Sequence, residues 1–484
     1  MRNISRLSFG RRDRISGPFR IPYSQIGIRI HTAFQNLHLG PFRIPHSQIR
    51  IFEQRLRRLI FLLLPNLAIN ASLSAAGKWT VEGFWENRGF LYAANSCSGC
   101  PHTEADSHLQ TQIQYRFGKN IFVFEPSIWM DTRHQVRRNQ ASYSDRTDQR
   151  PVLSTNEFYL LIPLGSLDLR VGKQKIVWGR ADGFNPTDNL TPFDYLDLME
   201  NERIGVTALR ARQYWGSASL DMVWIPTFTP TRLPLLAQRW FPLRARDQAR
   251  GVEVRSSVKY PATTPAHSQV ALRWDDSRRG WDYSASYFSG WNDIPDYNIQ
   301  FAVSSRSVQL DLARSFSRLQ VIGADFAGVL GGRALRGEFG FFRPERKNNL
   351  PLINDRRNYI QYALGTDWRW GDWYAIAQWV GDNSLGTRST FDIPGGPPRF
   401  PDRGFGQAVL GRVERTLNSW SSVHVNAVIR FQDADFLLKP EYLYDISQSW
   451  KLQAGFLILG GHRSGFLGQY HENSRMYIRL KQSF

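Results

Sequence analysis

Apolar and polar side chains alternate along most of the chain beyond residue 77. Val423, Val425 and Ala427, for example, are separated by His424 and Asn426. Because successive side chains of a β-strand point to opposite faces of a sheet, this period of two predicts strands with one apolar and one polar face. The same pattern recurs in residues 167–171, 308–312, 422–431 and 450–458. The chain is therefore predicted to be all-β.

Three further features favour a membrane barrel over a soluble β-sandwich. Many alternating segments are about nine to eleven residues long, which a tilted strand needs to cross a bilayer. Aromatic residues mark the segment ends, as in the interfacial girdles of barrels, and these are Trp281, Trp368, Trp370, Trp373, Tyr442, Tyr444 and Trp450. In the last segment Met476, Ile478, Leu480 and the terminal Phe484 share a face that Gln482 interrupts. A terminal aromatic residue is typical of bacterial outer-membrane barrels, whose last strand carries the assembly signal.

The spacing of the segments predicts an up-and-down order of antiparallel strands. We expect the last eight near residues 335–342, 358–369, 372–380, 405–414, 422–431, 436–446, 450–459 and 475–484. The connections between them alternate between long, polar stretches and short turns, as expected when one rim of a barrel faces outward. Residues 432–435 are an exception, a short connection where a long one is expected. The same spacing over residues 77–484 predicts a transmembrane barrel of about 16 to 18 strands.

The segment before the barrel has the plan of a secretory signal peptide. Residues 55–58 carry positive charge, residues 59–69 form an apolar run, and small residues follow up to Ala76. We therefore predict a signal peptide at 55–76 and delivery to the outer membrane of a Gram-negative bacterium. Residues 1–54 contain a near-duplicate, 17–26 and 40–49. They are predicted to be an unstructured or mis-started extension, with a basic binding arm as the alternative.

The charge distribution argues against nucleic-acid binding. Residues 1–76 hold twelve arginines, no lysine and two acidic residues, so more than half of the net charge of +19 lies in a segment that the mature protein is predicted to lack. In the mature chain, most of the remaining positive charge is predicted to lie in loops, for example in the arginines at positions 133, 137, 138, 146 and 150. We expect such residues to contact outer-membrane lipid and lipopolysaccharide phosphates, or to attract anionic solutes. The barrel-assembly machinery is the other expected partner, and the oligomeric state is left open.

Residues 170–198 carry the most specific motif. Arg170, Gly172, Lys173-Gln174 and Trp178-Gly179 resemble a strand and following loop of alginate-export-like porins and related outer-membrane barrels. The resemblance implies passive movement of small or polymeric solutes. The loop after this strand is rich in Gly, Pro and charged residues, so that it either folds inward to narrow the pore or forms an ordinary extramembrane loop. The candidate pore and constriction residues are Arg170, Lys173, Gln174, Arg180, Asp182, Asp188, Arg336 and Arg430.

The two cysteines, Cys97 and Cys100, are followed by Pro101 and His102. Haem attachment needs histidine directly after the second cysteine, so this motif is excluded. A local disulfide is predicted for an oxidising compartment, and a Cys/His metal site with His102 and His108 is the alternative. The chain shows no motif for a cofactor.

The sequence thus predicts an outer-membrane porin for small polar or anionic solutes, including oligosaccharides or polysaccharides. Strand parity predicts a mixed lumen with a small positive excess, and the inward set is Arg170, Arg255, Arg336, Arg430, Lys439, Lys451, Arg479 and Lys481 with Asp168, Glu253, Asp311, Glu338, Glu441 and Asp445. Two alternatives remain. One is a barrel enzyme, for which Asp445, His462, His471 and Glu472 are scattered candidates. The other is a structural or adhesion barrel with a plugged lumen.

Overall fold

The computed structural model describes residues 79–94, 100–235, 238–241, 252–303, 308–345, 357–385, 406–432, 434–463 and 465–484. The predicted extension and signal peptide lie outside this set, so both stay predictions. Among the described residues, no helix has the length and apolar character to cross a membrane.

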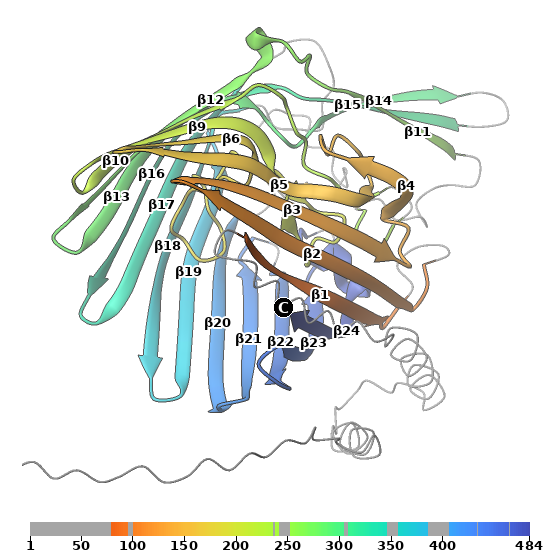
Figure 1. Ribbon diagram of the computed structural model, residues 1–484. Coiled ribbons are helices and arrows are strands. Elements are labelled where there is room, and N and C mark those ends of the chain that lie inside the picture. The colour runs from red at the N-terminus through yellow and green to blue at the C-terminus, as the bar shows by residue number, and fades with distance from the viewer. Residues whose placement is uncertain are drawn as a thin grey trace, which may run out of the picture. The chain divides into compact units, whose positions relative to one another are not determined.

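Eighteen strands of the described residues form one closed antiparallel barrel (Figure 1). Each strand pairs with its neighbours in chain order, and the first pairs with the last, from Phe84 with Ser483 to Tyr92 with Arg475. The strands are β1 (Trp79–Tyr92), β2 (Thr103–Phe117), β3 (Asn120–Asp131), β5 (Arg150–Leu164), β6 (Leu167–Gln174), β9 (Val206–Trp215), β10 (Ala218–Ile225), β12 (Gln269–Arg278), β13 (Trp281–Trp291), β16 (Arg318–Leu330), β17 (Arg333–Pro344), β18 (Tyr359–Trp370), β19 (Trp373–Ser384), β20 (Gln407–Asn418), β21 (Ser421–Arg430), β22 (Phe436–Asp445), β23 (Trp450–Gly460) and β24 (Arg475–Ser483). The predicted fold class is confirmed.

The remaining elements lie in connections between barrel strands. β4 (Val136–Ser142) pairs in parallel with β5, and β7 (Phe193–Asp194) pairs with β8 (Glu202–Arg203). Two 3-10 helices are η1 (Pro265–His267) and η2 (Gly468–Asn473). β11 (Val252–Lys259), β14 (Asp296–Val303) and β15 (Val308–Ser315) form a separate three-stranded sheet, which projects beside the barrel in Figure 1.

This small sheet corrects one part of the sequence analysis. Glu253, Arg255 and Asp311 were expected to face the barrel interior, but β11 and β15 do not belong to the barrel wall. The expectation was wrong because a period of two arises in any sheet, whether it closes into a barrel or stands apart.

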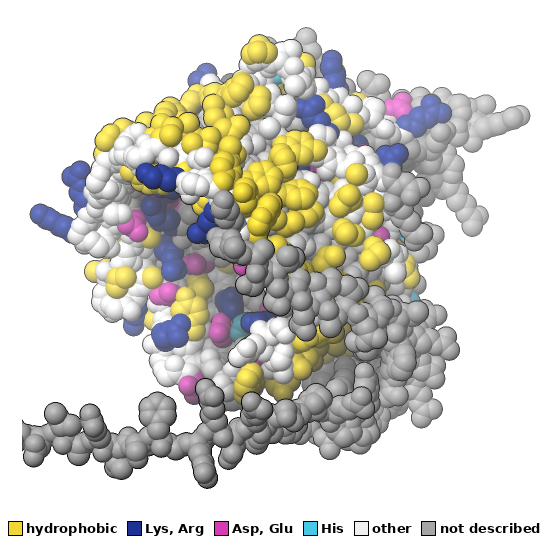
Figure 2. All heavy atoms as spheres, viewed as in Figure 1, with side chains coloured by type: hydrophobic (Ala, Val, Ile, Leu, Met, Phe, Trp, Pro, Cys, Tyr) yellow, Lys and Arg dark blue, Asp and Glu magenta, His cyan; other side chains and the backbone are white. Residues whose placement is uncertain are grey.

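The barrel wall is apolar outside and polar inside. On β12, Val270 and Leu272 are 46% exposed, whereas Arg273, on the opposite face, is 5% exposed. Figure 2 shows hydrophobic side chains gathered over the outer face of the wall where β5, β6 and β9 lie. This distribution is the reverse of a soluble protein's, and it is the one that a lipid environment favours.

The two rims of the barrel differ as the sequence predicts. At one rim, turns of two to four residues join neighbouring strands, and Gly216 has the positive φ (+60°) that a two-residue hairpin turn requires. At the other rim lie long connections such as 132–149, 175–205 and 461–474. The short connection 431–435 is again the exception among them.

The last residue closes the barrel seam. Gly83 donates its N–H to the Phe484 carbonyl at 2.9 Å, and the Phe484 N–H donates to the Gly83 carbonyl at 3.0 Å. The Phe484 ring lies directly over Gly83, because a Cβ added at Gly83 would approach its Cζ to 3.0 Å.

We expect Phe484→Ala to slow barrel assembly without changing the final pairing, since both backbone hydrogen bonds of residue 484 persist in alanine. The measurement is the rate at which the refolding chain gains the heat-sensitive, compact migration of a folded barrel on a gel. Leu330→Ala is the matched control, because Leu330 is 65% exposed next to a short turn. Equal rates for both variants would contradict a role for Phe484 in assembly.

Candidate functional site

The connection 175–205, between β6 and β9, runs through the barrel interior. Near its start it contacts inward side chains of β12, β16 and β17, and near its end it contacts those of β1 and β24. These two groups of strands stand on opposite sides of the closed ring. Of the two arrangements that the sequence left open, the structure therefore shows the inward one.

Glu338 on β17 anchors the start of this connection. Its carboxylate accepts hydrogen bonds from the backbone N–H groups of Arg180 and Ala181 (2.6 Å for Ala181) and from the Thr187 hydroxyl (3.1 Å). Gly179 has φ +97°, and a Cβ there would lie 2.6 Å from Glu338 Oε1. The close approach of backbone to carboxylate thus requires glycine in the Trp178-Gly179 motif.

Ion pairs hold the same part of the connection against the wall. The Arg180 guanidinium pairs with Asp325 on β16 and, at 3.0 Å, with Asp275 on β12. Asp182 accepts a hydrogen bond from Arg336 Nη1 at 2.6 Å. Because both pairs keep part of their side-chain surface exposed, they lie where the connection borders open space.

The far end of the connection is held by buried charges. Asp197 pairs with Arg133 and with Arg475 of β24, each at 2.7 Å. Glu200 pairs with Arg88 of β1 at 3.3 Å and with Arg479. A buried charge left without its partner is strongly destabilising, so these pairs fix where the connection can lie.

Asp188 is an acidic group of the connection whose pKa is raised towards neutral pH. Burial raises the pKa of its carboxyl to about 6, against the lowering effects of Arg203 and of the Trp178 backbone N–H. Nearby Glu338 raises it further. Arg203, on β8, forms the ion pair with Asp188.

The structure brings together only some of the predicted site residues. Arg180, Asp182, Asp188 and Arg336 gather around the inward connection. Arg170 lies on the neighbouring wall, with its guanidinium over the Tyr159 ring at 4.5 Å. The four residues around the connection form the candidate constriction, and a part for Arg170 in it stays a prediction.

Lys173 and Gln174 are buried at the base of the connection, 1% and 0% exposed. Lys173 pairs with Asp145, and the Gln174 amide donates to the Ala208 carbonyl at 3.2 Å. Both residues therefore support the wall and the rim. Contrary to the prediction, they do not face a channel.

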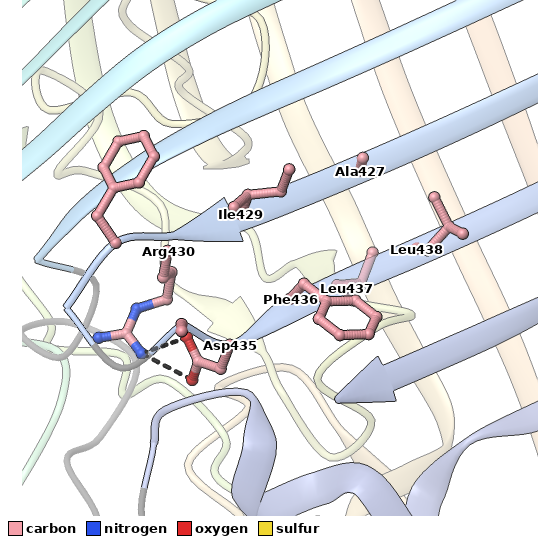
Figure 3. A pocket seen from close by; sticks show the side chains of 9 residues that line it. Ala427, Ile429, Arg430, Asp435, Phe436, Leu437 and Leu438 are labelled. Carbon is pink, nitrogen blue, oxygen red and sulfur yellow. Dashed lines mark hydrogen bonds and ion pairs between the residues drawn. The ribbon is translucent and has the colours of Figure 1, made fainter. Parts of the chain in front are cut away.

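Arg430 also differs from its predicted place. It is 1% exposed, and its guanidinium pairs with Asp435 at 2.8 Å across the short connection 431–435 (Figure 3). Asp435 also accepts the backbone N–H of Leu467 at 2.6 Å. Ile429 and Leu438 project away from this ion pair, so Arg430 tightens a hairpin whose other face is apolar.

Three of the predicted loop arginines, Arg133, Arg146 and Arg150, have partners within the protein. Arg133 and Arg150 are 7% and 2% exposed, and Arg150 pairs with Asp194 at 2.8 Å. Arg146 donates to the Phe228 carbonyl at 2.7 Å. Arg133 and Arg150 are therefore unable to reach lipid phosphates, contrary to the expectation from sequence, because inward connections supply their partners.

Sequence reasoning missed the anchoring residues of the wall. Glu338 was expected to face inward, but its role depends on backbone groups 158 residues away. Asp325 and Asp275 carried one available signal, a carboxylate on the inward face of an alternating strand. Alternation predicts which face of the sheet such a carboxylate occupies, but it does not predict which residue pairs with it.

The described residues hold no cluster of three or more potential metal ligands. Cys97 lies outside the described residues, so its disulfide with Cys100 stays a prediction.

The fold and the site define a closed antiparallel β-barrel with the 175–205 connection held inside it. No family model matches the sequence, and no curated protein matches it. Among solved structures, OccAB2 of Acinetobacter baumannii is similar, with 9% identity, 84% of this chain and 98% of that chain covered, and a TM-score of 0.48. A loop-deletion mutant of OmpT, an outer membrane protein of Vibrio cholerae, has 9% identity, coverages of 85% and 100%, and a TM-score of 0.40. A mutant of Rh. blastica porin has 8% identity, coverages of 84% and 100%, and a TM-score of 0.38.

We expect Gly179→Ala to detach the start of the inward connection, because the added methyl group overlaps the Glu338 carboxylate. Overpacking of this kind costs about 1–3 kcal/mol. The measurement is limited proteolysis of the folded barrel, with faster cleavage expected between residues 175 and 205. In the control Gly411→Ala, the new Cβ has only an ordinary contact at 3.7 Å. A cleavage rate like that of the parent in Gly179→Ala would refute the close approach.

A second prediction concerns Asp188 and pH. Its pKa rises from 3.8 to about 6 on folding, so the folded chain binds this proton more tightly than the unfolded chain. The ionised carboxyl therefore costs stability above pH 6, and the cost disappears as the pH falls towards 4. Relative to Asp188→Asn, the parent should gain up to about 3 kcal/mol of unfolding free energy between pH 7 and pH 4.

Denaturant unfolding in detergent micelles at both pH values provides this measurement. Asp168→Asn is the control, since Asp168 accepts a hydrogen bond from the Tyr214 hydroxyl (3.2 Å) in an exposed setting. The stability gain of the parent between pH 7 and pH 4 is compared once with Asp188→Asn and once with Asp168→Asn. If the gain relative to Asp188→Asn is not the larger one, the predicted role of burial at Asp188 is wrong.

Proposed function

We propose that the protein is a porin of the Gram-negative outer membrane, a water-filled channel through which small polar or anionic solutes diffuse passively. The observation that carries this proposal is the closed barrel with an apolar exterior, a charged interior and a connection across its lumen. An apolar outer wall is stable in lipid, whereas charged inward side chains need water or partners. The 175–205 connection narrows the channel, and its ion pairs keep it in place.

Partly exposed inward charges support a weak preference for anions. The side chains of Arg210, Arg212 and Arg412 are 16%, 35% and 41% exposed. The acidic groups that pair with these arginines are less exposed, since Asp221 and Asp275 are 2% and 14% exposed. Charges that keep contact with water act on passing ions more than buried pairs do, so the arginines dominate at these three positions.

The resemblance of residues 170–198 to alginate-export-like porins extends the proposal to oligosaccharides and polysaccharides as solutes. Outer-membrane lipid, lipopolysaccharide and the barrel-assembly machinery remain proposed partners.

We expect the purified chain to give stepwise conductance in planar bilayers and an anion-selective reversal potential in a salt gradient. Arg170→Ala and Arg180→Ala should each shift the reversal potential towards cation selectivity. Arg180→Ala should have the larger effect because it leaves Asp275 and Asp325 with one arginine partner fewer. A screened single charge changes selectivity modestly, so shifts of a few-fold in the anion-to-cation permeability ratio are expected.

Arg415→Ala is the matched control. Arg415 lies on β20 over the Trp373 ring at 5.1 Å, on the outward face that Val413 shares. The substitution Arg415→Ala removes one positive charge outside the lumen, so it should leave the anion-to-cation permeability ratio unchanged. Cation selectivity in the parent, or equal shifts in all three variants, would contradict the proposed lumen.

The buried ion pairs of the far end favour a second candidate, a structural barrel with a plugged lumen. Asp197 is 0% exposed and Arg475 is 4% exposed, so this part of the cross-section is filled by protein. Stable insertion of folded barrels without conductance steps would favour this candidate over the channel.

An enzyme remains a weaker candidate. His471 lies 3.8 Å from Glu472 in η2, on the rim of long connections. Asp445 pairs with Lys451 beside the short turn 446–449 at the opposite rim. Asp445 is therefore separated from His471 and Glu472, with which it would have to combine in an active site.

A further inference from the structure

A histidine of the barrel wall, His424 on β21, lies at the edge of the barrel interior. Ile429 on the same strand is 51% exposed on the outer face, and the odd spacing between the two residues places His424 on the inner face. The His424 side chain is 10% exposed, whereas those of Arg412 and Glu414 on β20 are 41% and 28% exposed. The imidazole therefore sits beside groups that contact water, from which it can take up a proton.

Both ring nitrogens of His424 are engaged in hydrogen bonds. Arg412 Nη2 lies 3.0 Å from Nδ1, and the Ser422 hydroxyl lies 2.9 Å from Nε2. A guanidinium only donates hydrogen bonds, so Nδ1 is the acceptor and the one ring proton of a neutral imidazole lies on Nε2, which donates to Ser422. This arrangement fits the uncharged ring and not the charged one.

Charged groups approach the His424 ring from both neighbouring strands. On β20, Glu414 lies 3.5 Å from Nε2 and pairs with Arg412 at 2.9 Å. On β22, Glu441 is the direct cross-strand partner of His424, and it pairs with Lys439 at 3.3 Å. While the ring is uncharged, two carboxylates balance two basic side chains.

Protonation of His424 upsets this balance. Nδ1 then carries a hydrogen in place of its lone pair, so the hydrogen bond from Arg412 is lost and the two cations repel each other. The imidazolium also competes for Glu414, with which Arg412 is paired. The Arg412 guanidinium, which is already partly exposed, is therefore free to turn into the barrel interior, where the wall has gained one positive charge.

We propose that His424 is a specificity-determining residue of the channel, which releases Arg412 into the lumen on protonation and so strengthens the preference for anions as the pH falls. This inference rests on the proposed function and adds a pH dependence to the selectivity of the lumen. An unperturbed imidazole changes its charge between about pH 5 and pH 8.

The test is the reversal potential of the full chain in planar bilayers under a fixed salt gradient, measured from about pH 8 down to about pH 5. In the parent, the anion-to-cation permeability ratio should rise about two- to fourfold over this range, as expected for one or two charges screened by salt. His424→Gln should lose most of this rise, because an amide still accepts from Arg412 but gains no charge. Arg412→Gln should keep only the part that comes from the ring itself.

His267→Gln is the matched control. His267 lies in η1, outside the barrel wall, and stacks on the Trp291 ring at 5.8 Å, so this variant should keep the whole rise. Asp188 titrates in the same pH range, but it is present in the parent and in every variant, so its contribution cancels in their comparison. Heat-sensitive migration on gels shows which variants are folded, and either lumen variant decides the question where the other fails to fold.

A rise that is largest in the parent and the control, intermediate in Arg412→Gln and smallest in His424→Gln supports the inference. The same rise in the parent and in His424→Gln overturns it, as does the same rise in the parent and in Arg412→Gln, since Arg412 is then not released. Conductance with no difference between the folded chains rejects this inference alone. Absence of conductance steps from every folded chain rejects the channel and the inference with it.

Discussion

Each polar group that lipid removes from water must find a partner inside the protein, and this constraint organises the whole structure. Backbone groups meet it by closing the sheet, so that β1 pairs with β24 and no edge is left within the ring. Polar side chains meet the same constraint because every second side chain of a barrel strand points inward. The apolar exterior and the charged interior thus follow from one requirement.

The inward charges in turn explain why a connection enters the barrel. Glu338 and Asp325 face the lumen from adjacent strands, and two carboxylates so close repel each other unless donors surround them. The connection brings backbone N–H groups to Glu338 and a guanidinium to Asp325. Asp197 and Glu200 do the same for the arginines of β1 and β24. The barrel wall and the connection therefore supply hydrogen-bond and ion-pair partners for each other.

The sequence predicted those features that depend on neighbouring residues. Alternation of apolar and polar residues predicted the strands, the alternation of long and short connections predicted the two rims, and parity predicted the inward face of Arg336 and Glu338. It failed where the outcome depends on distant contacts. β15 alternates like a barrel strand, yet it pairs with β11 and β14. Arg430 has inward parity, but Asp435 and the 461–474 connection bury it.

Placement by ion pairs also changes how the lumen would select solutes. In the proposed channel most charges are paired, so a passing solute would meet few free charges, chiefly the partly exposed arginines Arg210, Arg212 and Arg412. Arg203 illustrates the pairing, because its charge is matched by that of Asp188.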